Sequence, residues 1–66
     1  MLRSIRALQS ALEISDAQLL LLGRSVAGDP QLRCIEDMLN VDLADLETEL
    51  LNIQFQAREA RRLSAA

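Results

Sequence analysis

The fold is decided by residues 43–62, LADLETELLNIQFQAREARR, which hold the most informative hydrophobic pattern of the sequence. Apolar residues recur in this stretch at alternating spacings of three and four, the pattern of a helix that packs along one seam against other helices. The pattern therefore predicts a long helix over 43–62 with one buried face. The residues of this seam are Leu43, Leu46, Leu50, Ile53, Ala57 and Ala60.

A second apolar row lies on the same predicted helix and consists of Ala44, Thr48, Leu51 and Phe55. At about 100° per residue, the centre of this row lies about 150° around the helix from the seam. A chain of 66 residues can cover only one of these faces with its remaining segments, and the other face then points to water. Because an exposed apolar patch of this kind usually marks an interface, we expect the row around Leu51 and Phe55 to bind another protein surface.

Two sequence signals divide the region upstream of this helix. The segment Ser15-Asp16-Ala17-Gln18 has the form of a capping box, in which the serine and glutamine side chains satisfy amides at the start of a helix. The segment Gly28-Asp29-Pro30 combines a glycine that can end one helix with a cap and a proline that can begin the next. Together with the pattern above, these signals predict helices over 3–14, 16–27, 30–39 and 43–62.

The junction near Ser15 is open to two interpretations. The capping box favours a break between two helices, whereas the apolar spacing runs through it without a change of phase. A phase this regular would survive a sharp bend only by coincidence, so we slightly favour one long or gently bent helix. The residues of this continuous row are Ile5, Leu8, Leu12, Ser15, Leu19, Leu22 and Val26.

These patterns predict an all-α fold, a small bundle of three to four helices in a single domain spanning 1–66. A single core in so short a chain seldom supplies more than about 3–5 kcal/mol of stability, so we expect dimerisation to complete the bundle. The predicted core consists of Ile5, Leu8, Leu12, Leu19, Leu22, Val26, Leu32, Ile35, Leu39, Leu43, Leu46, Leu50 and Ile53.

The composition offers little to a catalytic or metal site. The sequence contains no histidine, lysine or tyrosine, and its single cysteine, Cys34, has no partner for a disulfide within the chain. The usual general bases are therefore missing, and one thiol cannot fill a tetrahedral zinc shell. We expect a protein that is not an enzyme, with no catalytic residue, no cofactor and no metal, in which Cys34 serves as a small buried apolar residue.

The net charge of −3 disfavours non-specific binding to nucleic acid, which depends on neutralising phosphates. The longest apolar run, at 19–22, is far shorter than the roughly 20 residues that span a bilayer. We therefore expect a cytoplasmic protein that does not bind membranes, and the use of arginine for every basic residue hints at a GC-rich bacterial gene. Residues 1–14 are free of acids up to Leu12, which leaves a targeting or membrane-surface segment as an open alternative.

An alternative function as a DNA-binding regulator comes from residues 32–50, whose spacing resembles a helix-turn-helix motif with its turn at 40–42. The second helix of that motif would approach the phosphates of DNA. Here it opens with acidic residues, which the phosphates would repel, so this alternative is the less favoured one. These acidic residues are Asp42, Asp45, Glu47 and Glu49.

Self-association fits the distribution of charge better, because the acidic residues come first in the helix over 43–62 and the arginines come last. If the helix is laid antiparallel on a copy of itself about Ile53, opposite charges and apolar side chains come together. We therefore predict a protein–protein interaction or regulatory module that forms an antiparallel homodimer, with another helical protein as the alternative partner. The predicted interface pairs Leu51 with Phe55, Thr48 with Arg58, and Asp45 with Arg61.

Overall fold

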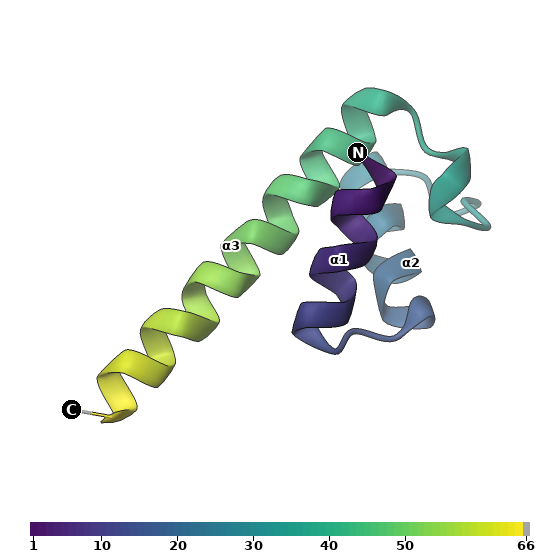
Figure 1. Cartoon of the computed structure of the whole chain (residues 1–66). Coiled ribbons are helices and arrows are strands. Elements are labelled where there is room, and N and C mark those ends of the chain that lie inside the picture. Colours follow the sequence, from purple (N-terminus) through teal and green to yellow (C-terminus); the bar gives the residue numbers. More distant parts are fainter. Residues whose placement is uncertain (66) are drawn as a thin grey trace.

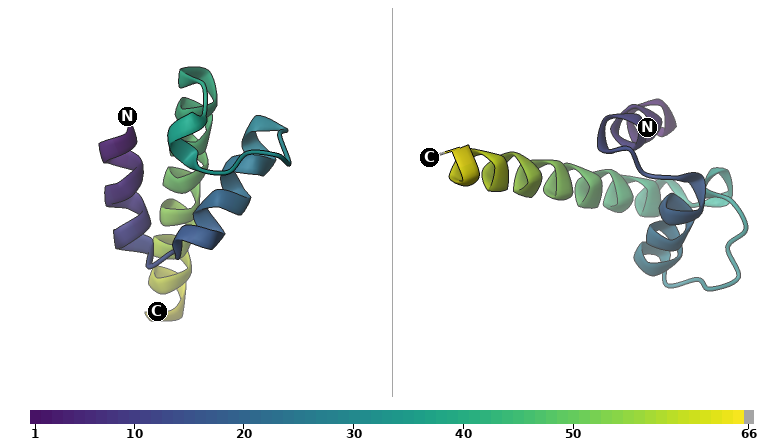
Figure 2. Two further views of the ribbon diagram at one scale, coloured as in Figure 1. Left: turned by 90° about the vertical axis from the view of Figure 1, so that its right-hand side faces the viewer. Right: turned by 90° about the horizontal axis from the view of Figure 1, so that it is seen from below.

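Three α-helices and one short 3-10 turn form the chain, in the order α1 (Leu2–Leu12), α2 (Asp16–Ala27), η1 (Ile35–Asp37) and α3 (Asn40–Ala65). The computed structural model describes residues 1–65, and none of these residues lies in a β-strand. The prediction of an all-α fold is therefore confirmed. In Figure 1, α1 and α2 lie beside the first half of α3, and the second half of α3 extends past them. The two further views in Figure 2 show the same arrangement.

The chain breaks between α1 and α2, so the preference for one continuous helix is wrong. Glu13 adopts a left-handed conformation with φ of 56°, and the amide of Ile14 donates to the carbonyl of Gln9 at 3.0 Å. The predicted capping box is present. The backbone amide of Gln18 donates to Ser15 Oγ at 3.2 Å, and the backbone amide of Ser15 donates to Gln18 Oε1 at 3.0 Å. These bonds satisfy the ends of both helices, and the bend lets apolar side chains of α1 and α2 enter the same core.

The helix predicted over 30–39 does not form. Gly28 ends α2 with φ of 65°, and the chain then runs without helical structure until the three residues of η1. Arg24 Nε on α2 donates to the carbonyl of Leu32 at 2.8 Å, which holds this segment back against the helix. A helix of ten residues gains little from its own hydrogen bonds in water, so such tertiary contacts decide its structure.

Gly23 on α2 explains where the segment 32–38 lies. A Cβ atom at this position would lie 3.1 Å from Met38 Sδ, 3.4 Å from Ile35 Cγ2 and 3.5 Å from Leu32 Cδ2. All three side chains are buried, so they pack directly on the bare backbone of α2 at this glycine. Leu39, predicted as a core residue, instead has 69% of its surface exposed, because the loss of helical phase turns Met38 inward in its place.

α3 begins three residues earlier than predicted, where the amide of Leu43 donates to the carbonyl of Leu39 at 2.9 Å. Met38 precedes this start and Leu43 lies in the first full turn, and both are buried. An apolar pair at these two positions has the spacing of a hydrophobic staple, which fixes the angle at which the chain enters a helix.

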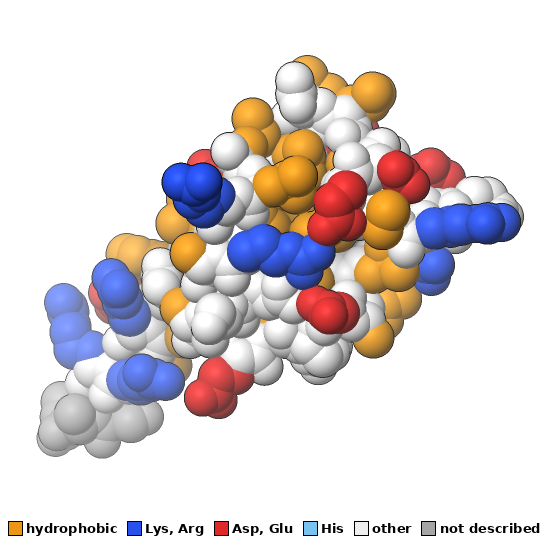
Figure 3. Space-filling model, turned by 45° about the vertical axis from the view of Figure 1, so that its right-hand side comes forward, with side chains coloured by type: hydrophobic (Ala, Val, Ile, Leu, Met, Phe, Trp, Pro, Cys, Tyr) orange, Lys and Arg blue, Asp and Glu red, His pale blue; other side chains and the backbone are white. Residues whose placement is uncertain are grey.

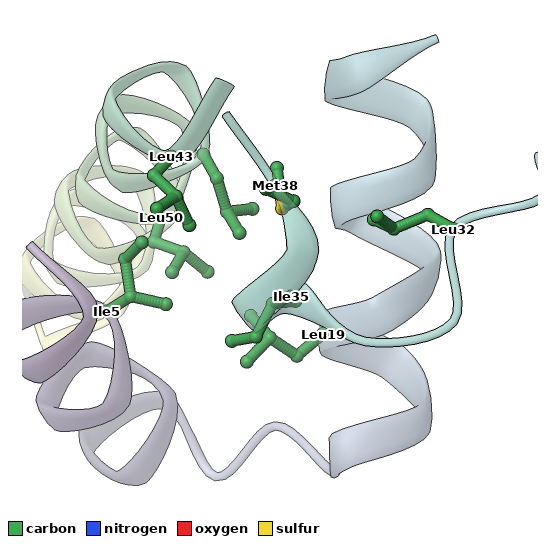
Figure 4. Packing of buried hydrophobic residues seen from close by; sticks show 8 residues of the cluster. Ile5, Leu19, Leu32, Ile35, Met38, Leu43 and Leu50 are labelled. Carbon is green, nitrogen blue, oxygen red and sulfur yellow. The ribbon is translucent and has the colours of Figure 1, made fainter. Parts of the chain in front are cut away.

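The core lies where α1, α2, η1 and the first half of α3 meet (Figure 4). Seven of the predicted core residues are buried, and Leu8, Leu12, Leu22 and Val26 pack against them while partly exposed. Ile53 is half-buried, and Met38 is the buried residue that the periodicity missed. The buried apolar side chains are Ile5, Leu19, Leu32, Ile35, Met38, Leu43, Leu46 and Leu50.

Candidate interface on the outer face of α3

The inner face of α3 packs on the rest of the chain, and the opposite face carries a continuous exposed row that we call the outer stripe. Leu46 and Leu50 on the inner face are fully buried, whereas Leu51 is 47% exposed and Phe55 is 64% exposed. The stripe keeps the alternating spacing of three and four along one straight helix. Its residues are Val41, Ala44, Thr48, Leu51, Phe55, Arg58 and Arg62, and each of them is exposed.

Two members of the outer stripe were not predicted. Val41 and Arg62 extend the row by one position at each end, and Val41 is as exposed as Phe55. The spacing already contained this signal, but the helix was predicted to start at residue 43, after Val41. The earlier start of α3 lengthens the candidate interface by most of a turn.

Four of the six predicted interface residues lie together on the outer stripe: Thr48, Leu51, Phe55 and Arg58. The Thr48 hydroxyl donates to the carbonyl of Ala44 at 3.1 Å, so its polar atom is satisfied within the helix. This side chain can therefore face a partner without leaving a hydrogen-bonding group unpaired.

The other two predicted interface residues, Asp45 and Arg61, are exposed but lie on opposite sides of the outer stripe. Sixteen positions separate them along an unbroken helix, which corresponds to about 160° around its axis. Two copies of α3 that pack along the stripe therefore cannot bring Asp45 of one copy against Arg61 of the other. The margin that carries Arg61 also carries Glu47, and the margin that carries Asp45 also carries Glu59.

Charge is distributed unevenly along α3. The first half contains four acidic residues, at 42, 45, 47 and 49, and three of the four charged residues in the second half are arginines. Figure 3 shows basic side chains gathered towards the C-terminal end of the helix. Arg58 and Arg62 belong to the outer stripe itself, so they would lie inside any helix contact made there.

A second polar feature ties α1 to α2 and η1 and has the character of a structural junction. Arg6 forms an ion pair with Asp16 at 3.1 Å and another with Glu36, and the Arg6 guanidinium holds the pKa of Glu36 below its ordinary value. A surface pocket of about 310 Å³ lies here, but the charges of Arg6, Asp16 and Glu36 at its wall satisfy one another. The arrangement holds the helices together and offers no unpaired charge from these three groups to a ligand.

Cys34 is half-buried at the start of η1, so the expectation of a small buried apolar residue within a helix is wrong. Its thiol donates to Asp37 Oδ2 at 3.2 Å, and this hydrogen bond raises the pKa of Cys34. A raised pKa keeps the sulfur as the less reactive thiol. Among the residues that the structure describes, no three His, Cys, Asp or Glu side chains are grouped to hold a metal ion.

The helix-turn-helix spacing over 32–50 lacks its first helix, because only Ile35–Asp37 forms a 3-10 turn in the part that precedes α3. Asp42, Asp45, Glu47 and Glu49 follow in the first half of α3, where a reader of DNA would need donors to bases and phosphates. The geometry therefore gives no support to this motif.

Comparisons with protein-family models, curated proteins and solved structures found no match for this chain. Within residues 1–65, no helix combines the length and the apolar character needed to cross a membrane. The structure itself defines the class: a three-helix protein whose longest helix buries one face and leaves an apolar face open on the opposite side.

Proposed function

We propose that this protein is a small protein–protein interaction module that self-associates through the outer stripe of α3. The observation that carries the proposal is the exposure of Leu51 and Phe55, one turn apart on a face that points away from the core. Full burial of two such side chains would contribute about 1.5–3 kcal/mol each. The apolar centre of the stripe therefore supplies the energy of association.

The distribution of charge favours a second copy of α3 as the occupant, laid antiparallel. In this orientation the acidic first half of each helix lies beside the arginine-rich second half of the other. A parallel pair would instead place Arg58 beside Arg58 and Arg62 beside Arg62. Exposed ion pairs are worth only about 0–1 kcal/mol each, so charge sets the direction and apolar burial sets the affinity.

A symmetric dimer of this kind presents each remaining surface twice, which suits an adaptor or a regulator that joins two identical partners. It would act inside the cell, where its free cysteine stays reduced. The role requires no chemistry beyond association.

The proposal is tested by the solution mass of three chains, measured by analytical ultracentrifugation at micromolar concentration. We expect the wild type to be a dimer and Leu51→Asp/Phe55→Asp to be a monomer with an unchanged circular dichroism spectrum. The matched control is Leu21→Asp, which places the same charge on an apolar residue of α2 that is 61% exposed and lies outside the stripe. We expect this control to remain a dimer.

A wild type that is folded and monomeric would overturn the proposal of self-association. A dimer that the double substitution leaves intact would overturn the assignment of the interface to the outer stripe. A wild type that is monomeric but binds a different helical protein through Leu51 and Phe55 would replace the second copy with that partner.

A further inference from the structure

Arg58 and Arg62 lie at unusual positions for charged residues, and this observation leads beyond the proposed self-association while resting on it. The two arginines continue the spacing of Leu51 and Phe55, so they occupy the centre of the contact face and not its margin. A charged side chain in the seam of a helix pair costs stability unless the partner offers space and opposite charge, and such residues commonly fix register. We propose that Arg58 and Arg62 are the residues that fix the orientation and the register of the α3 pair.

The antiparallel pairing that places Leu51 of each copy on Phe55 of the other satisfies both arginines. In this register Arg58 faces Thr48 and Arg62 faces Ala44 of the second copy. Both facing residues are small, so the aliphatic parts of the arginines can lie across the partner helix while their charged ends reach its margins. The carboxylates next to Thr48 and Ala44 are those of Asp45, Glu47 and Glu49.

Registers shifted by one heptad lose either the acidic neighbours of the arginines or the contact between Leu51 and Phe55. A shift of one heptad in one direction places Leu51 against Arg62 of the second copy. A shift in the other direction places Leu51 against Thr48 and Phe55 against Ala44, and it leaves Arg62 opposite Asp37, which precedes the start of α3. A parallel pair brings each arginine against its own copy, where like charges repel.

The residues at the margins of the outer stripe contribute little to the choice of orientation and register. Arg58 and Arg62 within the stripe therefore decide it. One margin brings Glu47 near Arg61 of the second copy, a favourable pair, whereas the other brings Asp45 near Glu59, an unfavourable one. Because exposed pairs of either kind are worth similar small amounts, these two contacts roughly cancel.

Disulfide trapping tests the orientation and the register together. Cys34→Ser removes the native thiol, and one cysteine is then introduced either as Asn52→Cys or as Thr48→Cys, both at exposed positions. In the proposed pairing the two copies of residue 52 lie side by side near the two-fold axis. The two copies of residue 48 are separated by ten positions along the axis, or about 15 Å, too far for a disulfide.

We expect mild oxidation to cross-link Asn52→Cys and to leave Thr48→Cys uncross-linked. The reverse result would indicate a parallel pair, and cross-linking of both or of neither would exclude a single register of this kind; each of these outcomes overturns the inference. If the wild type is a dimer that Leu51→Asp/Phe55→Asp dissociates, the proposed function stands whatever the cross-links show. A monomeric wild type would overturn both the proposed function and the inference about Arg58 and Arg62.

Charge inversion tests the role of the arginines separately. We expect Arg58→Glu/Arg62→Glu to weaken self-association at least tenfold, and Asp45→Arg/Glu47→Arg to do the same. An equimolar mixture of these two chains should regain a dimer, because each inverted surface then faces its opposite. A mixture that stays monomeric, or an arginine variant that dimerises as tightly as the wild type, would show that Arg58 and Arg62 do not determine the pairing.

Discussion

At the scale of single residues, Glu13 is the position where the backbone conformation and the residue type disagree. It is the one non-glycine residue with a positive φ within residues 1–65, and it closes α1 in the left-handed conformation. In this conformation a residue with a Cβ atom is less stable than glycine by roughly 1–2 kcal/mol. Glycine also makes the unfolded chain more flexible, and this entropy offsets part of the stability that a substitution to glycine would gain. We therefore expect Glu13→Gly to raise the free energy of unfolding by about 0.5–1 kcal/mol in urea denaturation.

The matched control for this prediction is Glu13→Ala, which removes the carboxylate but keeps the Cβ atom. The difference between the two variants isolates the backbone term. Equal stability of the glycine and alanine variants would mean that the left-handed turn at residue 13 carries no strain.

At the scale of the elements, the packing of the segment 32–38 on α2 depends on the missing side chain of Gly23. Alanine at this position gains about 1 kcal/mol of helix propensity but pushes the flexible end of Met38 aside, so we expect Gly23→Ala to be close to neutral. Leucine is an equally good helix former but fills the space of Ile35 and Leu32. Overpacking of this kind typically costs about 1–3 kcal/mol, which urea denaturation at one fixed protein concentration would measure for Gly23→Leu. Equal stability of the leucine and alanine variants would contradict the packing of the segment 32–38 on α2 at Gly23.

The same element marks the limit of what the sequence could predict. α2 and α3 follow from signals within their own residues: a capping box, a glycine stop and a regular apolar spacing. The segment 28–39 carries a helix-start signal too, but a side chain from α2 and a glycine on its surface decide the outcome. Such contacts join residues that are distant in sequence, and no local pattern encodes them. The capping box at Ser15 did indicate a break between α1 and α2. The apolar spacing that runs through this point by coincidence favoured one continuous helix instead.

The candidate interface could be predicted in part for a related reason. Helical periodicity separates the faces of α3, so the exposure of Leu51 and Phe55 follows from spacing alone. The predicted pair Asp45–Arg61 does not fit two helices packed along the outer stripe, because it was counted along the sequence, whereas a contact between helices also depends on the angle around the axis. Arg58 was predicted at this face, and Arg62 continues the same spacing within the helix predicted over 43–62, so the spacing also contained its position.

At the scale of the whole molecule, α3 belongs to the core and to the candidate interface at the same time. Its first half supplies Leu43, Leu46 and Leu50 to the core, while its second half extends past α1 and α2 in a molecule 43 Å long (Figure 2). A chain this small has little stability to spare, so the proposed dimerisation, in which only folded chains associate, would stabilise the fold. Thermal unfolding of such a dimer would include its dissociation, and the melting temperature would then depend on protein concentration.

We expect the melting temperature of the wild type to rise by about 3–5 °C for each tenfold increase in protein concentration, since half of 1.4 kcal/mol is gained per chain. Leu51→Asp/Phe55→Asp should melt lower and at a temperature independent of concentration, because it folds and unfolds as a monomer. Differential scanning calorimetry over two decades of concentration measures both effects. A dimeric wild type whose melting temperature stays constant would mean that the chains unfold while still associated, and the outer stripe would then join the molecules without supporting their fold.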